Sequence, residues 1–103
     1  MQMQQVRYFL ALCEERSFTH AAKRCGVSQP SLTNAIIVLE QELGGALFQR
    51  KPIVALTMLG HVLHPYFEQI AENAQHAREA AQAMADVRTS PPIPLSPARP
   101  SYP

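Results

Sequence analysis

The stretch that decides the fold is residues 17–43, which read SFTHAAKRCGVSQPSLTNAIIVLEQEL. Ser17 is a good N-cap for a short helix, and Gly26 can end that helix by taking a left-handed conformation. Ser28 caps a second helix, whose first turn holds Pro30 at a place where a missing N–H costs nothing. The stretch therefore predicts two helices joined by a tight turn.

The second of these helices has an apolar face and a polar start. Its apolar residues recur at steps of four, three and four, which predicts a buried stripe of Leu32, Ile36, Leu39 and Leu43. The polar start comprises Ser28, Gln29, Pro30, Ser31, Thr33 and Asn34. A helix that reads DNA bases needs a free N-terminal turn, and the amides of Gln29 and Asn34 can bond to adenine edges. A merely solvated helix face is the alternative.

The flanking segments complete a small domain. Residues 3–16 carry Val6, Phe9, Leu10 and Cys13 at helical spacing, which predicts a further helix. Two short β-like runs, 46–50 and 54–57, flank a turn at 51–53 and read as a hairpin wing. The expected fold is therefore mainly α, a winged helix-turn-helix with a two-stranded wing. Arg50 and Lys51 suit phosphate or minor-groove contact, unless they are simply solvated.

A long helix is predicted to follow, capped by Thr57 and running to about Thr89. At 1.5 Å per residue, roughly 30 residues make a rod of about 45 Å, too long for so small a core. Its apolar seam has a period of 3.5 and comprises Leu63, Phe67, Ile70, Ala74, Ala77, Ala81 and Met84. This linker helix is expected to form a homodimer by pairing with a second copy, and Pro65 is expected to bend it. The alternative is an amphipathic helix that packs only on its own domain.

The predicted organisation is a DNA-binding domain over residues 1–60, a dimerisation helix over 61–89 and a disordered proline-rich tail over 90–103. The net charge of the chain is only +1, and residues 1–60 carry six Lys or Arg against four Glu. Any affinity for nucleic acid must therefore depend on a few well-placed cations.

Other functions find little support in the sequence. The scattered Cys13 and Cys25 predict reduced, buried thiols and a cytoplasmic protein, and neither a secretory signal nor a membrane-spanning run is expected. His61 and His64 have no supporting ligands for a metal, and Glu40 and Glu42 are interpreted as solvated surface. No catalytic constellation is visible, so we expect neither an enzyme nor a cofactor.

The chain resembles the DNA-binding region of LysR-type transcriptional regulators over about residues 3–89. The similarity lies in the helix-turn-helix residues described above and in the run LEQELG at residues 39–44, and it continues in Leu47-Phe48, Arg50, Leu56-Thr57 and Gly60. It implies a winged helix-turn-helix followed by a linker helix that pairs two subunits. It also implies that Ser28, Gln29, Pro30, Thr33 and Asn34 approach double-stranded DNA, with Arg50 in the wing.

Three departures from the family pattern bear on function. The family often has Arg at the position of Asn34, which predicts a different base preference. The wing tip at residues 51–55 lacks a second arginine, which predicts a weaker wing contact. A proline-rich tail stands where the effector-binding domain would begin, so no small-molecule effector is expected. Two alternatives stay open: a helical module that pairs with intact regulators, and a non-functional remnant of a regulator gene.

Overall fold

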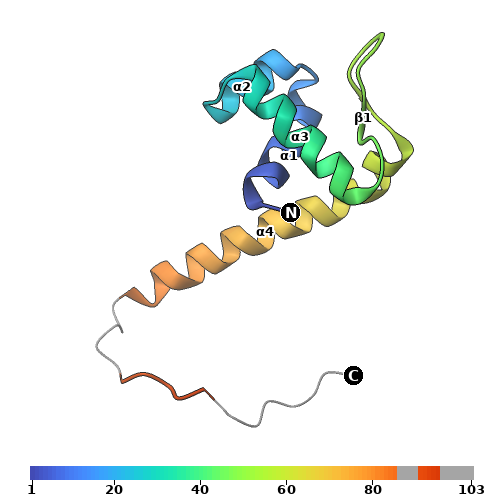
Figure 1. The fold of residues 1–103 in the computed structure, drawn as a ribbon. Helices are drawn as coiled ribbons and strands as arrows, with labels where there is room; N and C mark the ends of the chain where they lie inside the picture. The colour runs from blue at the N-terminus through green and yellow to red at the C-terminus, as the bar shows by residue number, and fades with distance from the viewer. Residues whose placement is uncertain (86–90, 96–103) are drawn as a thin grey trace.

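The computed structural model describes residues 1–85 and 91–95. Three helices pack together, a hairpin extends beside the third helix, and a long helix runs beneath them (Figure 1). The elements are α1 (Met3–Glu15), α2 (Phe18–Cys25), α3 (Gln29–Leu43), β1 (Phe48–Gln49), β2 (Ala55–Leu56) and α4 (Met58–Ala83). The predicted fold class, a mainly α winged helix-turn-helix followed by a long helix, is confirmed.

The capping residues act as the sequence predicts. The Ser17 side chain accepts a hydrogen bond from the His20 N–H at 3.1 Å and begins α2. Gly26 ends α2 at φ 70°, and Gly44 ends α3 at φ 85°, both in the left-handed region that favours glycine. Local chemistry therefore determines where α2 begins and ends and where α3 ends.

The core lies where α1, α3, the wing and α4 meet. Of the predicted α3 stripe, Leu32, Ile36 and Leu39 are fully buried and Leu43 is partly buried against the same core. The Phe9 ring of α1 stands at the centre, with ring centroids 5.3 Å from Phe48 and 4.6 Å from Phe67. These aromatic contacts join the wing and the long helix to the helical domain.

The junction between the wing and α4 is tightly packed. The Thr57 side chain caps α4 by accepting from the Gly60 N–H at 3.1 Å, and the Thr57 N–H donates to the Leu47 carbonyl at 2.9 Å. A Cβ on Gly60 would lie 2.2 Å from the Leu47 carbonyl oxygen. Only glycine allows this approach of α4 to the chain before β1.

Helix α4 ends earlier than predicted. Its last α-helical residue is Ala83 and Met84 is the C-cap, so the expectation of α-helix at Met84 is wrong, while Ala85 has 3₁₀-helical geometry. Residues 86–90 lie outside the described part. The predicted strands are also shorter, with two residues each, paired antiparallel as Phe48 with Leu56 and Gln49 with Ala55. Residues 91–95 are exposed and form neither helix nor strand, and the rest of the predicted disordered tail is not described.

The predicted seam on α4 has two unlike halves. Phe67 is only 3% exposed because it packs on Phe9, and Leu63 and Ile70 lie partly buried against the same core. The chain's own domain thus already covers Phe67 and part of Leu63 and Ile70, as the alternative of a helix packed on its own domain expects. Further along, Ala74 is half-buried, and the remaining seam residues, Ala77, Ala81 and Met84, are exposed.

Both cysteines are half-buried free thiols rather than fully buried ones. Burial raises the pKa of the Cys13 thiol to about 12, and the neighbouring carboxylates of Glu14 and Glu68 add to the rise. Among the described residues, no helix combines the length and apolar character that crossing a membrane requires.

Candidate nucleic-acid interface

The first turn of α3 is held in place by its cap. The Ser28 hydroxyl accepts from the Ser31 N–H at 3.2 Å and donates to the Ser31 hydroxyl at 2.9 Å. Pro30 has no N–H to satisfy, and the Gln29 N–H belongs to the group that helix geometry leaves without a partner inside the helix. The turn thus offers a donor and a positive dipole end to a negatively charged group.

The predicted reading face is open to solvent. Gln29, Pro30, Ser31 and Asn34 are exposed, as is the Ser28 cap, while Thr33 is half-buried. Asn34 follows Pro30 by four residues, and Thr33 follows Gln29 by four, so the set covers neighbouring strips of one helix face. The structure therefore brings all six predicted α3 residues together at one end of the helix.

Thr19 on α2 is a neighbour that the sequence interpretation missed as a site residue. Its hydroxyl donates to Gln29 Oε1 at 3.2 Å, and both side chains are exposed. The bond links the second residue of α2 to the first residue of α3 and leaves the Gln29 amide nitrogen free of this contact. The crossing of the two helices creates the pair, so periodicity alone could not reveal it.

Two apolar side chains continue the outer face of α3. Ile37 is 37% exposed and Val38 is 52% exposed, one turn beyond Asn34. The sequence contained a signal for them, because only Ile36 of the run Ile36-Ile37-Val38 belongs to the buried stripe. Apolar groups on a reading face can contact the methyl group of thymine.

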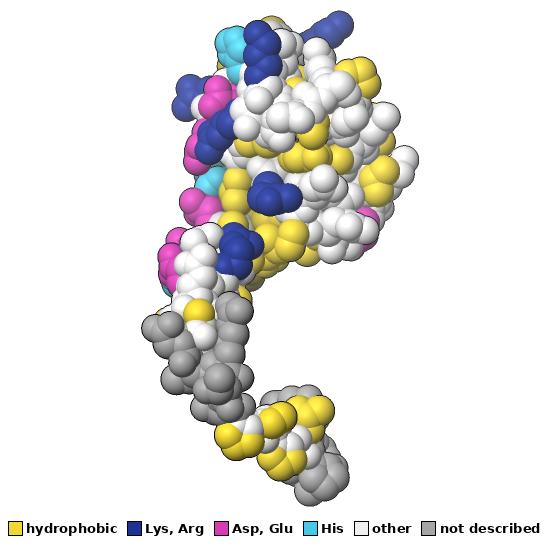
Figure 2. Space-filling model, turned by 90° about the vertical axis from the view of Figure 1, so that its left-hand side faces the viewer, with side chains coloured by type: hydrophobic (Ala, Val, Ile, Leu, Met, Phe, Trp, Pro, Cys, Tyr) yellow, Lys and Arg dark blue, Asp and Glu magenta, His cyan; other side chains and the backbone are white. Residues whose placement is uncertain are grey.

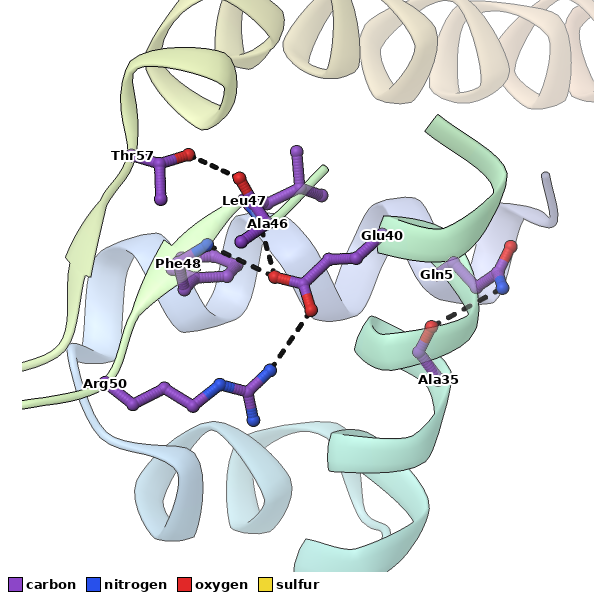
Figure 3. A network of polar contacts seen from close by, with 8 residues as sticks. All are labelled: Gln5, Ala35, Glu40, Ala46, Leu47, Phe48, Arg50 and Thr57. Carbon is purple, nitrogen blue, oxygen red and sulfur yellow. Dashed lines mark hydrogen bonds and ion pairs between the residues drawn. The ribbon is translucent and has the colours of Figure 1, made fainter. Parts of the chain in front are cut away.

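Glu40 has a different role from the one predicted. The expectation of a solvated surface carboxylate is wrong, since its side chain is only 13% exposed. Its Oε2 accepts from the Leu47 N–H at 2.7 Å and from the Phe48 N–H at 3.3 Å (Figure 3). Its Oε1 accepts from Arg50 Nη2 at 3.2 Å. One α3 side chain thus holds the start of β1 and the arginine that follows β1.

The two predicted wing cations lie in different surroundings. The Arg50 guanidinium pairs with Glu40 and also lies over the Phe18 ring, with its central carbon 4.8 Å from the ring centroid. Lys51 is exposed at the wing tip beside Ile53, which is 68% exposed. The structure therefore brings Lys51 to the surface of the tip and holds Arg50 at its base.

Among the other cations of the domain, Arg24 is balanced by neighbouring carboxylates. Arg24 at the end of α2 pairs with Glu14 and, at 3.3 Å, with Glu15, and its hydrogen bond to Glu14 raises the pKa of the guanidinium. In the face shown in Figure 2, dark blue cations are scattered among yellow apolar side chains, and several lie beside acidic ones. Residues 1–85 and 91–95 include no cluster of three His, Cys, Asp or Glu side chains that could hold a metal.

These features define a class of protein. The structure combines a capped helix that has an exposed polar start with a short helix packed against it, in which small Ala21 and Ala22 are buried, and with a hairpin beside them. This arrangement is a winged helix-turn-helix DNA-binding domain. The family model described as "Bacterial regulatory helix-turn-helix protein, lysR family" matches residues 3–61. The chain belongs to this family, which confirms the resemblance seen in the sequence.

Curated relatives are transcriptional regulators. The HTH-type transcriptional regulator BudR of Klebsiella aerogenes is 40% identical over 86 residues, which cover 82% of this chain and 60% of BudR. The HTH-type transcriptional regulator BenM of Acinetobacter baylyi is 36% identical over 89 residues, which cover 84% of this chain and 29% of BenM. The chain therefore spans less than two thirds of the length of either regulator.

Solved structures of DNA complexes are similar to this chain. The BenM_DBD/catB site 1 DNA complex matches with a TM-score of 0.78 and 35% identity, covering 82% of this chain and 97% of that one. The CbnR_DBD–DNA complex matches with a TM-score of 0.76 and 35% identity, covering 82% of this chain and 99% of that one. The similarity covers almost the whole of these DNA-binding domains.

Proposed function

We propose that this chain is a sequence-specific transcriptional regulator that inserts the start of α3 into the major groove of double-stranded DNA. The observation that carries the proposal is the exposed, capped and polar first turn of α3. The residues proposed to approach DNA are Ser28, Gln29, Pro30, Ser31, Thr33 and Asn34 on α3, and Arg50 and Lys51 in the wing. Relatives named as regulators and DNA complexes of similar domains support it.

The proposed contacts divide by chemistry. Gln29 and Asn34 carry amides that match the donor and acceptor pattern of adenine in the major groove. The Ser28–Ser31 turn suits a phosphate, because hydroxyls and the positive end of the helix dipole lie together there. Exposed Val38 is placed to contact a thymine methyl further along the groove. Lys51 at the wing tip suits a phosphate outside the groove.

We further propose a homodimer that forms through the distal half of α4 and acts in the cytoplasm. Ala77, Ala81 and Met84 lie exposed beyond the domain, with Met84 at 60% exposure. Two copies would place two α3 helices on half-sites about 34 Å apart or a multiple of that distance. No enzymatic activity, cofactor or small-molecule effector forms part of the proposal.

DNA binding is tested by fluorescence anisotropy with duplexes of about 30 base pairs, a length of about three helical turns. The duplexes are first selected from a randomised library by their binding to the full chain. A dimer that touches about six to ten phosphates should lose about 10³–10⁵ in affinity between about 50 and 200 mM salt. Absence of binding at low salt by protein with a helical circular dichroism spectrum would refute the proposal.

Pairing is tested by sedimentation of the unmodified chain and two matched variants. Ala81→Glu places a charge in the proposed apolar interface, where an unpaired charge is costly, and should give a monomer. Ala83→Glu introduces the same charge two residues on, about 200° around the helix, and should leave the dimer intact. A strict monomer at high micromolar concentration for the unmodified chain would remove the dimer from this account.

A further inference from the structure

We propose that Arg50 is a positioning residue: together with Glu40 and Phe18 it fixes the angle of the wing to the reading helix, and it does not contact a phosphate itself. This inference rests on the proposed DNA-binding function and revises the role given there to one wing residue. It also assigns a function to Glu40, which lies outside the predicted reading face.

The wing needs an anchor because its own ladder is short. Each strand has two residues, and an isolated two-stranded hairpin is marginally stable at best in water. Glu40 supplies what the ladder lacks, since its Oε2 accepts two successive N–H groups, those of Leu47 and Phe48. Because the carboxylate belongs to α3, these bonds tie the wing directly to the helix that is proposed to enter the groove.

Arg50 completes the anchor from the other side. Its guanidinium donates to Glu40 Oε1 at 3.2 Å and stacks over the ring of Phe18, the first residue of α2. Side chains from α2 and α3 therefore meet at the guanidinium that follows β1, and Figure 3 shows the contact with Glu40 of α3. An ammonium on a flexible stem cannot reproduce both the stacking and the directed bond, so lysine should be a poor replacement.

The end of the second strand of the hairpin is held separately, by Thr57. The Thr57 hydroxyl donates to the Ala46 carbonyl at 2.6 Å, and the Thr57 N–H donates to the Leu47 carbonyl at 2.9 Å. With both ends held, the exposed tip that carries Lys51 has a defined place relative to α3. A change at Arg50 or Glu40 should therefore lower DNA affinity by leaving the wing less ordered before binding, while Lys51 still reaches its phosphate in the complex.

The same geometry argues against a phosphate contact by Arg50. Glu40 lies within ion-pair distance of the guanidinium and already balances its charge. A phosphate would have to share the guanidinium with this carboxylate or displace it, and displacement would leave a charge in a site only 13% exposed. An already neutralised cation also releases few counterions when DNA binds.

Salt dependence separates positioning from contact. The full chain, Arg50→Met, Arg50→Lys, Glu40→Gln and the control Lys51→Met are titrated with the selected duplex at several salt concentrations. Lys51→Met should reduce the slope of log affinity against log salt by about 0.9 per subunit, as expected for one lost phosphate contact. Arg50→Met and Glu40→Gln should each weaken binding about tenfold and leave the slope unchanged.

Two further results decide the assignment. Arg50→Lys should bind as weakly as Arg50→Met, whereas a phosphate contact would be largely retained by lysine. The double variant Glu40→Gln/Arg50→Met should be no weaker than either single variant, because both remove the same anchor. A reduced slope for Arg50→Met together with rescue by Arg50→Lys would overturn the proposal and make Arg50 a contact residue.

Amide hydrogen exchange tests the anchor without DNA. In Arg50→Met the N–H groups of Leu47 and Phe48 should exchange about tenfold faster, while the α1 amides of the core keep their protection. Unchanged protection at both positions would overturn the proposal even if DNA binds as expected. If the unmodified chain binds no DNA, the proposed function fails, and faster exchange in the variant would still establish the anchor.

Discussion

Phe67→Ala should destabilise the helical domain itself, because the ring belongs to the core of its own chain. The side chain is 3% exposed and meets the Phe9 ring edge-on at 4.6 Å. Truncating a buried phenylalanine to alanine costs about 3–5 kcal/mol. For a domain of this size each kcal/mol lowers the melting temperature by about 4–8 °C, so a decrease of at least about 12 °C is expected.

The assay is thermal unfolding followed by circular dichroism at two protein concentrations that differ about a hundredfold, since a stability due to pairing changes with concentration. The matched control is Tyr66→Ala, which removes an adjacent aromatic ring that is 65% exposed. Phe67→Ala should lower the melting temperature by the same amount at both protein concentrations. Tyr66→Ala should leave the melting temperature at the lower concentration close to that of the unmodified chain. If Phe67→Ala lowered the melting temperature only at the higher protein concentration, the ring would belong to a contact between subunits and not to the core of its own chain.

Three more predictions address the site, the junction between the wing and α4, and the half-buried Cys13 thiol. Gln29→Ala and Asn34→Ala should each relax base preference by about 1–3 kcal/mol in a binding-site selection, and an unchanged preferred site would remove that residue from the reading face. Gly60→Ala should destabilise the fold by about 1–3 kcal/mol in urea unfolding, because its Cβ would lie 2.2 Å from the Leu47 carbonyl oxygen; equal stability would show that α4 can shift freely. Since the pKa of Cys13 is raised to about 12, iodoacetamide should alkylate it very slowly at neutral pH and rapidly only after unfolding in urea, as followed by mass spectrometry. Because the pKa of Cys13 is raised on folding, the contribution of this thiol to stability is complete below about pH 9.0, its ordinary pKa, and is lost as the pH rises towards 12.

The helical part of the fold could be predicted because its signals are local. Ser17, Ser28 and Thr57 cap helices through bonds to N–H groups three residues on, and such bonds require no knowledge of the rest of the chain. Periodicity likewise identifies the buried face of α3. The end of α4 was harder, because no glycine or proline ends the helix at Ala83 and an alanine-rich sequence favours continuation.

The candidate site divides in the same way. The polar first turn of α3 is a local pattern and was predicted residue by residue, although its contact with DNA stays a prediction. The role of Glu40 could not be predicted, because its partners at Leu47, Phe48 and Arg50 become neighbours only when the hairpin folds back on α3. A lone glutamate on a helix ordinarily indicates solvated surface, and only tertiary structure distinguishes the anchor.

The seam on α4 shows how one helix can serve two partners. A 3.5-residue repeat drifts by only about 20° per heptad on a straight helix of 3.6 residues per turn, so length separates its members more than rotation does. Phe67 is buried in the domain, whereas Ala77 and Met84 lie beyond it and are exposed. Tyr66 is eighteen residues before Met84, about five turns at 3.6 residues, so it lies on the exposed side with them. The surface left for a second copy is therefore mostly alanine with a tyrosine and a methionine. Alanine buries little area, so the proposed pairing should be weak in solution and strengthened on DNA, where two half-sites hold both subunits at high effective concentration.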